Sequence, residues 1–311
     1  MKVSTIKNAV IFFINDNYRF RCILLDKLRH SGILNWLSDK AFIKLSYWVF
    51  FKKCINLKDP QSFNEKLNWL KLHNRNANQS VIVDKYEVKK YICDRIGEQY
   101  IIKTYGVWNS FEEIDFDKLP QKFVLKCTHD SGSVVICKDK SNFDIENAKQ
   151  KLTNGLKQNL FWWGREWPYK SVQPRILAEE CLEDLSDNDL KDYKFFCFDG
   201  VVKCFKVDFG RFTEHRANYY SYKGDLLDIG EVVCPPNHEY NIKLPENLAE
   251  MVSLAENLSK GFPFLRVDFY NVNGHIYFGE LTFYPASALS PFIDYKSDLE
   301  LGQYLRLPKC K

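Results

Sequence analysis

Several motifs of common enzyme and membrane classes are missing from this sequence. It contains no GxSxG elbow, no HExxH helix and no GxxxxGK[ST] loop, so the signatures of serine hydrolases, zinc peptidases and P-loop nucleotidases are absent. A net charge of +4, without a basic run or an interleaved basic–aromatic pattern, is too small to indicate a nucleic-acid partner. Internal repeats and low-complexity segments are also lacking.

The cysteines form no CxxC pair, which argues against a zinc site and against a disulfide framework. They are scattered, and several stand inside apolar, strand-like runs such as residues 136–137 and 196–197. We therefore expect reduced core thiols in a cytoplasmic protein. The ten cysteines are Cys22, Cys54, Cys93, Cys127, Cys137, Cys181, Cys197, Cys204, Cys234 and Cys310.

Long apolar runs are absent too. The runs at residues 9–14 and 47–51 are too short to span a bilayer, and Asn15 and Asp16 end the first one. Residues 9–51 are rich in Phe, Ile, Arg and Lys, a composition compatible with peripheral contact at the inner face of a membrane. The expectation is a soluble chain with this one peripheral option.

What is present indicates a packed globule with 45% hydrophobic and 15% aromatic residues. Residues 5–55 read as helical, and Ser62 with Glu65 forms a capping box that opens another helix. A helix over residues 84–96 follows. After Gly97, strand patterns dominate, including a strong hairpin signal around residues 199–200. Early helices followed by antiparallel hairpins predict an α+β fold.

A late hairpin, residues 264–287, carries polar residues at alternate positions. Arg266 and Asp268 alternate with apolar residues on its first strand, and Glu280 and Thr282 stand on the second. A three-residue loop closing Asn271 against His275 places these four side chains on one face. Such a face suits a hard divalent cation that holds phosphate, although a solvated polar face is the alternative.

Three upstream features have both a functional and an ordinary interpretation. Lys126 ends a strand before a small-residue loop that could cradle phosphate, or be a plain hairpin turn. Lys89 lies on a helix, where exposed lysines are usually only solubilising. Glu179 and Glu180 end an apolar strand. They could form a hinge that contacts a nucleotide, or they could be an ordinary acidic strand end.

The order of these features resembles the ATP-grasp superfamily, and four stretches are similar to its TupA-like branch, named for teichuronopeptide biosynthesis and found among bacterial surface-polysaccharide genes. The stretches are residues 62–76, 84–92, 119–133 and 266–285, and the resemblance spans about residues 40–300. It implies an ATP-grasp fold, in which antiparallel sheets clamp a nucleotide. It also implies a helical N-terminal region (1–75) and an ATP-grasp domain (76–311), divided into a nucleotide clamp (76–180) and a metal-binding and substrate half (181–311).

The resemblance also assigns roles to residues. Lys89 and Lys126 correspond to the lysines that hold ATP phosphates, and Arg266 with Lys126 serves the transferred phosphoryl group. By the same resemblance, Asp268, Glu280 and Thr282 would bind Mg²⁺. The nucleotide contacts are the flap residues Ser131, Gly132 and Ser133, the adenine hinge Glu179, Glu180 and Leu182, and Asp192 for the ribose.

Two positions depart from the superfamily pattern. Thr282 stands where Asn is common, and Asp130 stands where the flap often has Gly.

The activity implied is ATP- and Mg²⁺-dependent ligation of a carboxylate to an amine through an acyl phosphate. The acceptor class is a uronic-acid-containing surface polysaccharide, or its precursor, of the capsule or lipopolysaccharide type. Two alternatives stay open: a glycosyltransferase of the same pathway, and a non-catalytic nucleotide-binding scaffold in a membrane-associated polysaccharide assembly.

Overall fold

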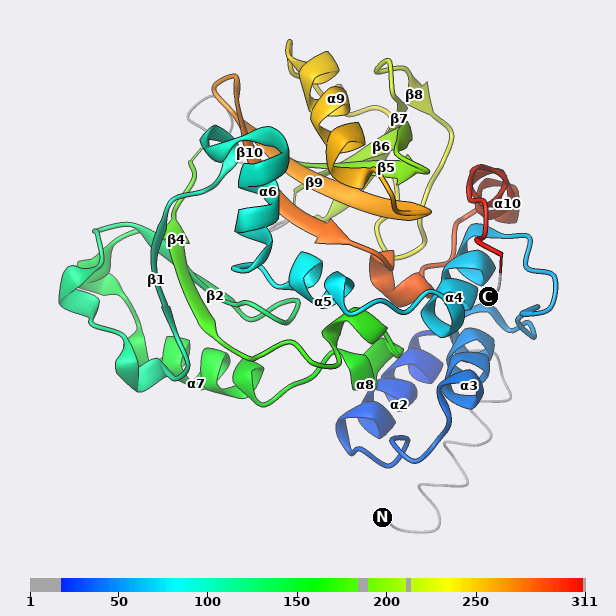
Figure 1. Cartoon of the computed structure of the whole chain (residues 1–311), viewed down its shortest axis with the longest axis horizontal. Coiled ribbons are helices and arrows are strands. Elements are labelled where there is room, and N and C mark those ends of the chain that lie inside the picture. The colour runs from blue at the N-terminus through cyan, green and yellow to red at the C-terminus, as the bar shows by residue number, and fades with distance from the viewer. Residues whose placement is uncertain (1–17, 184–189, 211–213, 310–311) are drawn as a thin grey trace.

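A computed structural model describes residues 18–183, 190–210 and 214–309 (Figure 1). None of the helices in these ranges is long and apolar enough to cross a membrane. The helices are α2 (Tyr18–His30), α3 (Asp39–Phe51), α4 (Phe63–His73), α5 (Asn78–Val83), α6 (Val88–Ile96), α7 (Ile145–Leu156), α8 (Phe161–Gly164), α9 (Leu248–Ser259) and α10 (Tyr295–Tyr304). The strands are β1 (Thr104–Trp108), β2 (Phe123–Cys127), β3 (Val134–Cys137), β4 (Ile176–Glu180), β5 (Asp192–Phe198), β6 (Val201–Phe209), β7 (Arg216–Ser221), β8 (Leu226–Leu227), β9 (Phe264–Val272) and β10 (His275–Thr282).

The strands form two antiparallel sheets, which confirms the α+β class. The smaller sheet has the order β1-β4-β2-β3 and the larger has the order β10-β9-β5-β6-β7-β8. In Figure 1 the small sheet lies at the left, the large sheet lies at the upper right, and α5 and α6 run between them. The polar strand residues that the sequence analysis selected are therefore divided between two sheets.

The small sheet packs one face against α7. Phe123, Leu125 and Cys127 alternate along β2 and are buried in one core with Ala148 and Leu152 of the helix. Because side chains alternate along a strand, the residues between them point to the other face of the sheet. That other face carries the polar groups described below.

The large sheet buries the odd-numbered residues of β9. Leu265, Val267 and Phe269 are fully buried in one core with Met251 and Ala255 of α9. The even-numbered residues Arg266 and Asp268 consequently lie on the opposite face.

Helix α4 covers one end of this opposite face. Its Phe63 ring lies 6.2, 5.8 and 5.0 Å from the rings of Phe196, Phe198 and Phe264. The predicted capping box of Ser62 and Glu65 at the start of α4 is present.

The register of the β9–β10 hairpin differs from the expected one at its turn. His275 pairs with Val272, so the loop has two residues, Asn273 and Gly274, both at positive φ as a type I′ turn requires. This turn alone would place Glu280 and Thr282 on the core face. A β-bulge at Gly279 restores the expected face.

Beyond the bulge, Glu280 pairs with Asp268, and Thr282 pairs with Arg266. The predicted three-residue loop was therefore wrong, whereas the predicted common face of the four side chains is confirmed.

The N-terminal region contains α2 and α3, joined by residues 31–38, in place of one continuous helical stretch. Residues 5–17 of the predicted helical segment lie outside the described ranges. Among the nine described cysteines none is in a disulfide, as expected, but Cys54 and Cys93 are exposed and are not core thiols. The division of the chain at residue 75 stays a prediction.

Candidate active site

The first polar cluster lies on the small sheet and joins Lys89, Lys126 and Glu179. The Lys89 Nζ lies 2.5 Å from one carboxylate oxygen of Glu179, and Lys126 forms an ion pair with the other. The Lys89 Nζ also donates to the carbonyl of Ile102 over 2.9 Å. The structure thus brings together three residues that the sequence analysis selected separately from a helix and two strands.

Electrostatics hold this cluster in its charged form. Burial opposes ionisation of Glu179, but the Lys126 and Lys89 ammonium groups outweigh it and lower the pKa of this carboxyl. Burial also lowers the pKa of Lys89, against the opposing effect of Glu179. Two ammonium groups face one carboxylate, so the cluster keeps a net positive charge, as a phosphate-binding position needs.

The loop between β2 and β3 is anchored at its base. Thr128, His129, Asp130 and Ser133 are buried, and His129 Nε2 lies 3.2 Å from the carbonyl oxygen of Gly155 in the last turn of α7. His129 is therefore a structural anchor and not a solvated loop residue. Burial also lowers its pKa.

Only the tip of the predicted flap, Ser131 and Gly132, is exposed. Gly132 has φ +107°, and a side chain there would meet no atom within 4 Å. The tip therefore has free space above it.

The face of the small sheet that carries Lys126 also has apolar positions. Val134 pairs with Lys126 and Ile136 pairs with Val124, and both β3 side chains are exposed, by 36% and 41%. Exposed aliphatic side chains beside an ammonium group offer a base a flat apolar contact next to its phosphates. The predicted hinge lies at the end of the neighbouring strand, since β4 ends at Glu180.

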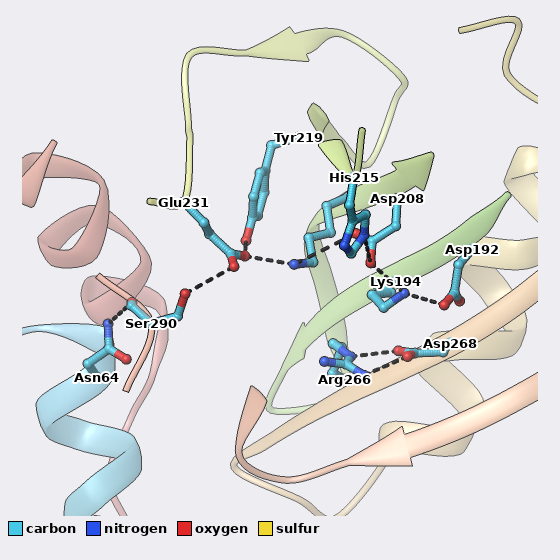
Figure 2. Close-up of polar contacts among 11 residues, drawn as sticks. Asn64, Asp192, Lys194, Asp208, His215, Tyr219, Glu231, Arg266, Asp268 and Ser290 are labelled. Carbon is cyan, nitrogen blue, oxygen red and sulfur yellow. Dashed lines mark hydrogen bonds and ion pairs between the residues drawn. The ribbon is translucent and has the colours of Figure 1, made fainter. Parts of the chain in front are cut away.

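The second polar cluster lies on the large sheet. Arg266 donates from Nε and Nη2 to both carboxylate oxygens of Asp268, over 2.7 and 2.6 Å (Figure 2). Burial raises the pKa of the Asp268 carboxyl to about 6, against the lowering effect of Arg266. Glu280, the cross-strand neighbour of Asp268, is partly exposed, so its carboxylate stays accessible.

These residues fit a hard divalent cation. Oxygen donors from two carboxylates and a hydroxyl are typical ligands of Mg²⁺. Among the described residues the buried Thr282 hydroxyl has no hydrogen-bond partner, and a buried polar group without one is costly. A bound cation would use that oxygen, together with Asp268 and Glu280.

Asp192 lies on the same face but contacts a residue that the sequence analysis did not select. It forms an ion pair with Lys194, which pairs in the sheet with Asp268 and also lies 2.9 Å from Asp208 (Figure 2). Its predicted contact with ribose remains a prediction.

A network further along this face was also missed. Lys206 Nζ lies 2.8 Å from the Glu231 carboxylate, which also accepts from the hydroxyls of Tyr219 and Ser290 (Figure 2). A cavity of about 70 Å³ lies between this network and Arg266. The available signal was the alternation of Asp192 with Lys194 in β5 and of Lys206 with Asp208 in β6, each across one apolar or aromatic residue.

Asp208, His215 and Cys234 offer ligand atoms within 4.8 Å of one another. Lys194 and Lys206 both approach the Asp208 carboxylate, at 2.9 and 3.8 Å. Two ammonium groups at the same carboxylate oppose a further cation, so we assign Asp208 to the ion-pair network.

The Tyr169 ring is buried in the larger core. Burial raises the pKa of the Tyr169 phenol well above its ordinary value, and the charges of Glu280 and Asp130 contribute to this rise.

The family model described as TupA-like ATPgrasp matches residues 65–306. A search of curated proteins found no match.

The solved structures that match part of this chain include three ligases. The D-alanine–D-alanine ligase of Bacillus anthracis is 20% identical, with 72% of this chain and 67% of that chain covered at a TM-score of 0.39. The L-amino acid ligase of Bacillus licheniformis is 13% identical, with 80% and 55% covered at a TM-score of 0.43. The ATP-grasp ligase PsnB, solved with a precursor variant, Mg and ADP, is 12% identical, with 66% and 51% covered at 0.39. This chain spans between about half and two thirds of the length of these ligases.

Proposed function

The chain belongs to the TupA-like ATP-grasp family, and we propose that it is an ATP- and Mg²⁺-dependent ligase that joins a carboxylate to an amine. The observation that carries this proposal is the common face of Arg266, Asp268, Glu280 and Thr282, which the Gly279 bulge creates. A net positive cluster of Lys89 on α6 with Lys126 and Glu179 of the small sheet supports it.

In this proposal the chain's residues position charge and exclude water. Lys89 and Lys126 bind the phosphates, and Arg266 orients the transferred phosphoryl group next to the acceptor carboxylate. Asp268, Glu280 and Thr282 would hold Mg²⁺, which neutralises the charge that develops on the phosphates. Phosphorylation of the carboxylate gives an acyl phosphate, and attack by the amine then releases phosphate and forms the amide.

The nucleotide itself would lie on the small sheet. The flap residues Ser131, Gly132 and Ser133 would cover the phosphates, with the backbone N–H groups of the exposed tip available for hydrogen bonds. Three further nucleotide contacts follow from the family resemblance. These are Glu179–Glu180 and Leu182 at the adenine, and Asp192 at the ribose.

We further propose a uronic-acid-containing surface polysaccharide or its precursor as acceptor, on the basis of the family's genomic setting. The cavity beside Arg266 supports an acceptor that inserts only a small group, because about 70 Å³ holds a carboxylate and little more. The bulk of a sugar chain would remain outside.

ADP release with Mg²⁺ and ATP, measured over a matrix of uronates and amines, tests this function. We expect release only when both a carboxylate and an amine are present, and its loss in Lys126→Gln. The matched control is Lys122→Gln, whose ammonium pairs with Glu183 at the surface. Turnover of a sugar nucleotide in place of ATP would favour a glycosyltransferase, and nucleotide binding without turnover of any pair would favour a scaffold.

A further inference from the structure

Positive charge is concentrated in the N-terminal part of the chain. Residues 1–58 contain 11 Lys and Arg residues against 3 Asp residues, whereas the whole chain has 44 against 40, so this segment carries +8 and the remainder carries −4. Such a division of charge within one chain points to an anionic partner at the basic end.

Helix α3 presents this charge on one face. Lys40, Lys44, Trp48 and Lys52 recur every four residues and therefore lie in a row along the helix, on the side away from the buried Phe42, Ile43, Ser46, Tyr47 and Val49. The Lys52 Nζ lies 5.2 Å from the centre of the Trp48 ring. We call the row of Lys40, Lys44, Trp48 and Lys52 the basic stripe.

Asp26 and Asp39, the acidic residues of α2 and α3, are both paired with arginines. Asp39 lies 2.6 Å from Arg75 and 3.6 Å from Arg165, so its charge is shared with two guanidinium groups. Asp26 is 3.3 Å from Arg29. The lysines of the stripe therefore dominate the potential at this surface.

Apolar groups are exposed beside the charge. The loop before α3 exposes 81% of Trp36 and 59% of Ile33, although both are large hydrophobic side chains. A hollow of about 410 Å³ opens along the stripe, lined by Lys44, Leu45, Trp48, Cys54 and Ile55. Its lining is mainly apolar.

We propose that the α2–α3 unit docks on an anionic lipid bilayer. Indole rings prefer the boundary between headgroups and acyl chains, and lysines near the surface bind anionic headgroups. An acidic protein, the alternative partner, would complement the charge of the lysines. It would not provide the apolar environment that the exposed Trp36 and Ile33 side chains need, whereas a bilayer does. In Figure 1 this unit lies at the lower right, on the far side of the molecule from α9 and β8, so docking leaves the large sheet open.

Co-sedimentation of the full chain with vesicles tests this proposal. We expect binding to phosphatidylcholine vesicles that contain phosphatidylglycerol, little binding to phosphatidylcholine alone, and weakening by salt. The triple variant Lys40→Gln, Lys44→Gln, Lys52→Gln should bind about 100-fold more weakly, at about fivefold for each lysine near the surface. Trp36→Ala should bind about tenfold more weakly.

Matched controls come from the opposite end of the molecule. Lys223→Gln, Lys243→Gln, Lys260→Gln removes the same charge from exposed positions, and Tyr222→Ala removes an exposed ring. Both should bind vesicles like the unchanged protein, and circular dichroism verifies that every variant is folded.

Equal losses in the stripe and control triples would show non-specific charge attraction and overturn the proposal. Absence of binding to phosphatidylglycerol vesicles would also overturn it, as would a Trp36-dependent dimer in sedimentation velocity without vesicle binding. Because the readout is vesicle binding, failure here leaves the proposed ligase activity unaffected.

Discussion

At the scale of single residues, the most informative group is the Glu179 carboxylate between two lysines. It is 5% exposed, while the side chains of Lys89 and Lys126 are 13% and 15% exposed. The carboxylate keeps two ammonium groups close together before any phosphate arrives. Without this carboxylate, the two ammonium groups would repel each other and move apart. Glu179 therefore preorganises them to bind phosphate.

Glu179→Gln should destabilise the protein by about 1–3 kcal/mol at neutral pH, because two largely buried ammonium groups lose their counter-charge. The fold lowers the pKa of Glu179 from its ordinary value of 4.5, so this stabilisation is present above that pH and is lost as the pH falls through the lowered value. Urea unfolding at neutral and at acidic pH measures the difference, which should be smaller in acid.

The matched control for this measurement is Glu183→Gln, which removes the exposed partner of Lys122. It should leave unfolding unchanged at both pH values. A Glu179→Gln protein as stable as the unchanged one at neutral pH would show that the triad does not hold the two lysines.

The raised pKa of the Asp268 carboxyl leads us to expect that metal binding depends on pH. This pKa is raised to about 6, so the folded protein favours the protonated carboxyl more than the unfolded chain does. In the absence of metal, the stability that Asp268 contributes is therefore lost as the pH rises through 6.

Mg²⁺ requires the ionised form, so its effect on nucleotide binding should fall as the pH drops through about 6. Titration of the protein with Mg²⁺ and a non-hydrolysable ATP analogue between pH 5 and 8 checks this, with metal-free nucleotide binding as the control. An Mg²⁺ effect that is constant across this range would contradict the assignment.

At the scale of elements, the β5–β6 and β9–β10 hairpins combine the same two features, a tight turn and a β-bulge. Each begins at a two-residue turn with both residues at positive φ, Asp199-Gly200 or Asn273-Gly274, and each carries a bulge further along. In β9–β10 the extra residue is Gly279. Without the bulge, a core residue would oppose Arg266, and the metal ligands would be divided between two faces.

Gly279→Ala tests the role of this bulge. A methyl group there would lie 3.1 Å from the Asp268 carbonyl oxygen and 3.3 Å from the Tyr270 ring, so the two strands must separate slightly. We expect a loss of about 1 kcal/mol in unfolding free energy and about a tenfold loss in Mg²⁺ affinity, because the Glu280 ligand moves relative to Asp268.

The control is Gly274→Asn in the turn of the same hairpin. Its φ of +81° tolerates Asn, and nothing lies within 4 Å of the added Cβ. Isothermal titration with Mg²⁺ should show unchanged affinity for this control. An unchanged affinity in Gly279→Ala would show that the bulge does not position the ligands.

The hairpins also show how far the sequence could be interpreted. Period-two alternation predicted Arg266 and Asp268 on one face, and the Asp199-Gly200 turn predicted the β5–β6 hairpin, because both signals are local. The bulge at Gly279 depends on the close approach of the Asp268 carbonyl, a contact between strands that one strand's sequence does not contain.

The partners of buried polar side chains could not be predicted from the sequence for a similar reason. His129 stands in the loop after β2, but the Gly155 carbonyl that it contacts belongs to a helix 26 residues away in the chain. The network of Lys194, Lys206 and Glu231 requires two strands and a loop to be assembled first. Pairings of this kind depend on tertiary packing and not on local pattern.

At the scale of the whole molecule, the proposed phosphate-binding lysine Lys126 lies on the small sheet, whereas the proposed metal ligands and Asp192 lie on the large sheet. A ligand that contacts both should stabilise the folded state in proportion to its affinity. At about 100 times its dissociation constant, a Mg²⁺–ATP analogue should add about 2.7 kcal/mol to the free energy of unfolding. Thermal unfolding should show this gain with Mg²⁺ and nucleotide together, and a smaller gain with either alone.

The central claim is that one nucleotide–metal complex uses both clusters, and calorimetric titration with a non-hydrolysable ATP analogue and Mg²⁺ tests it most directly. Lys126→Gln should weaken nucleotide binding with or without the metal, whereas Asp268→Asn should remove only the gain that Mg²⁺ provides. Lys122→Gln should bind like the unchanged protein. Unaltered Mg²⁺-dependent binding in both Lys126→Gln and Asp268→Asn would contradict the account.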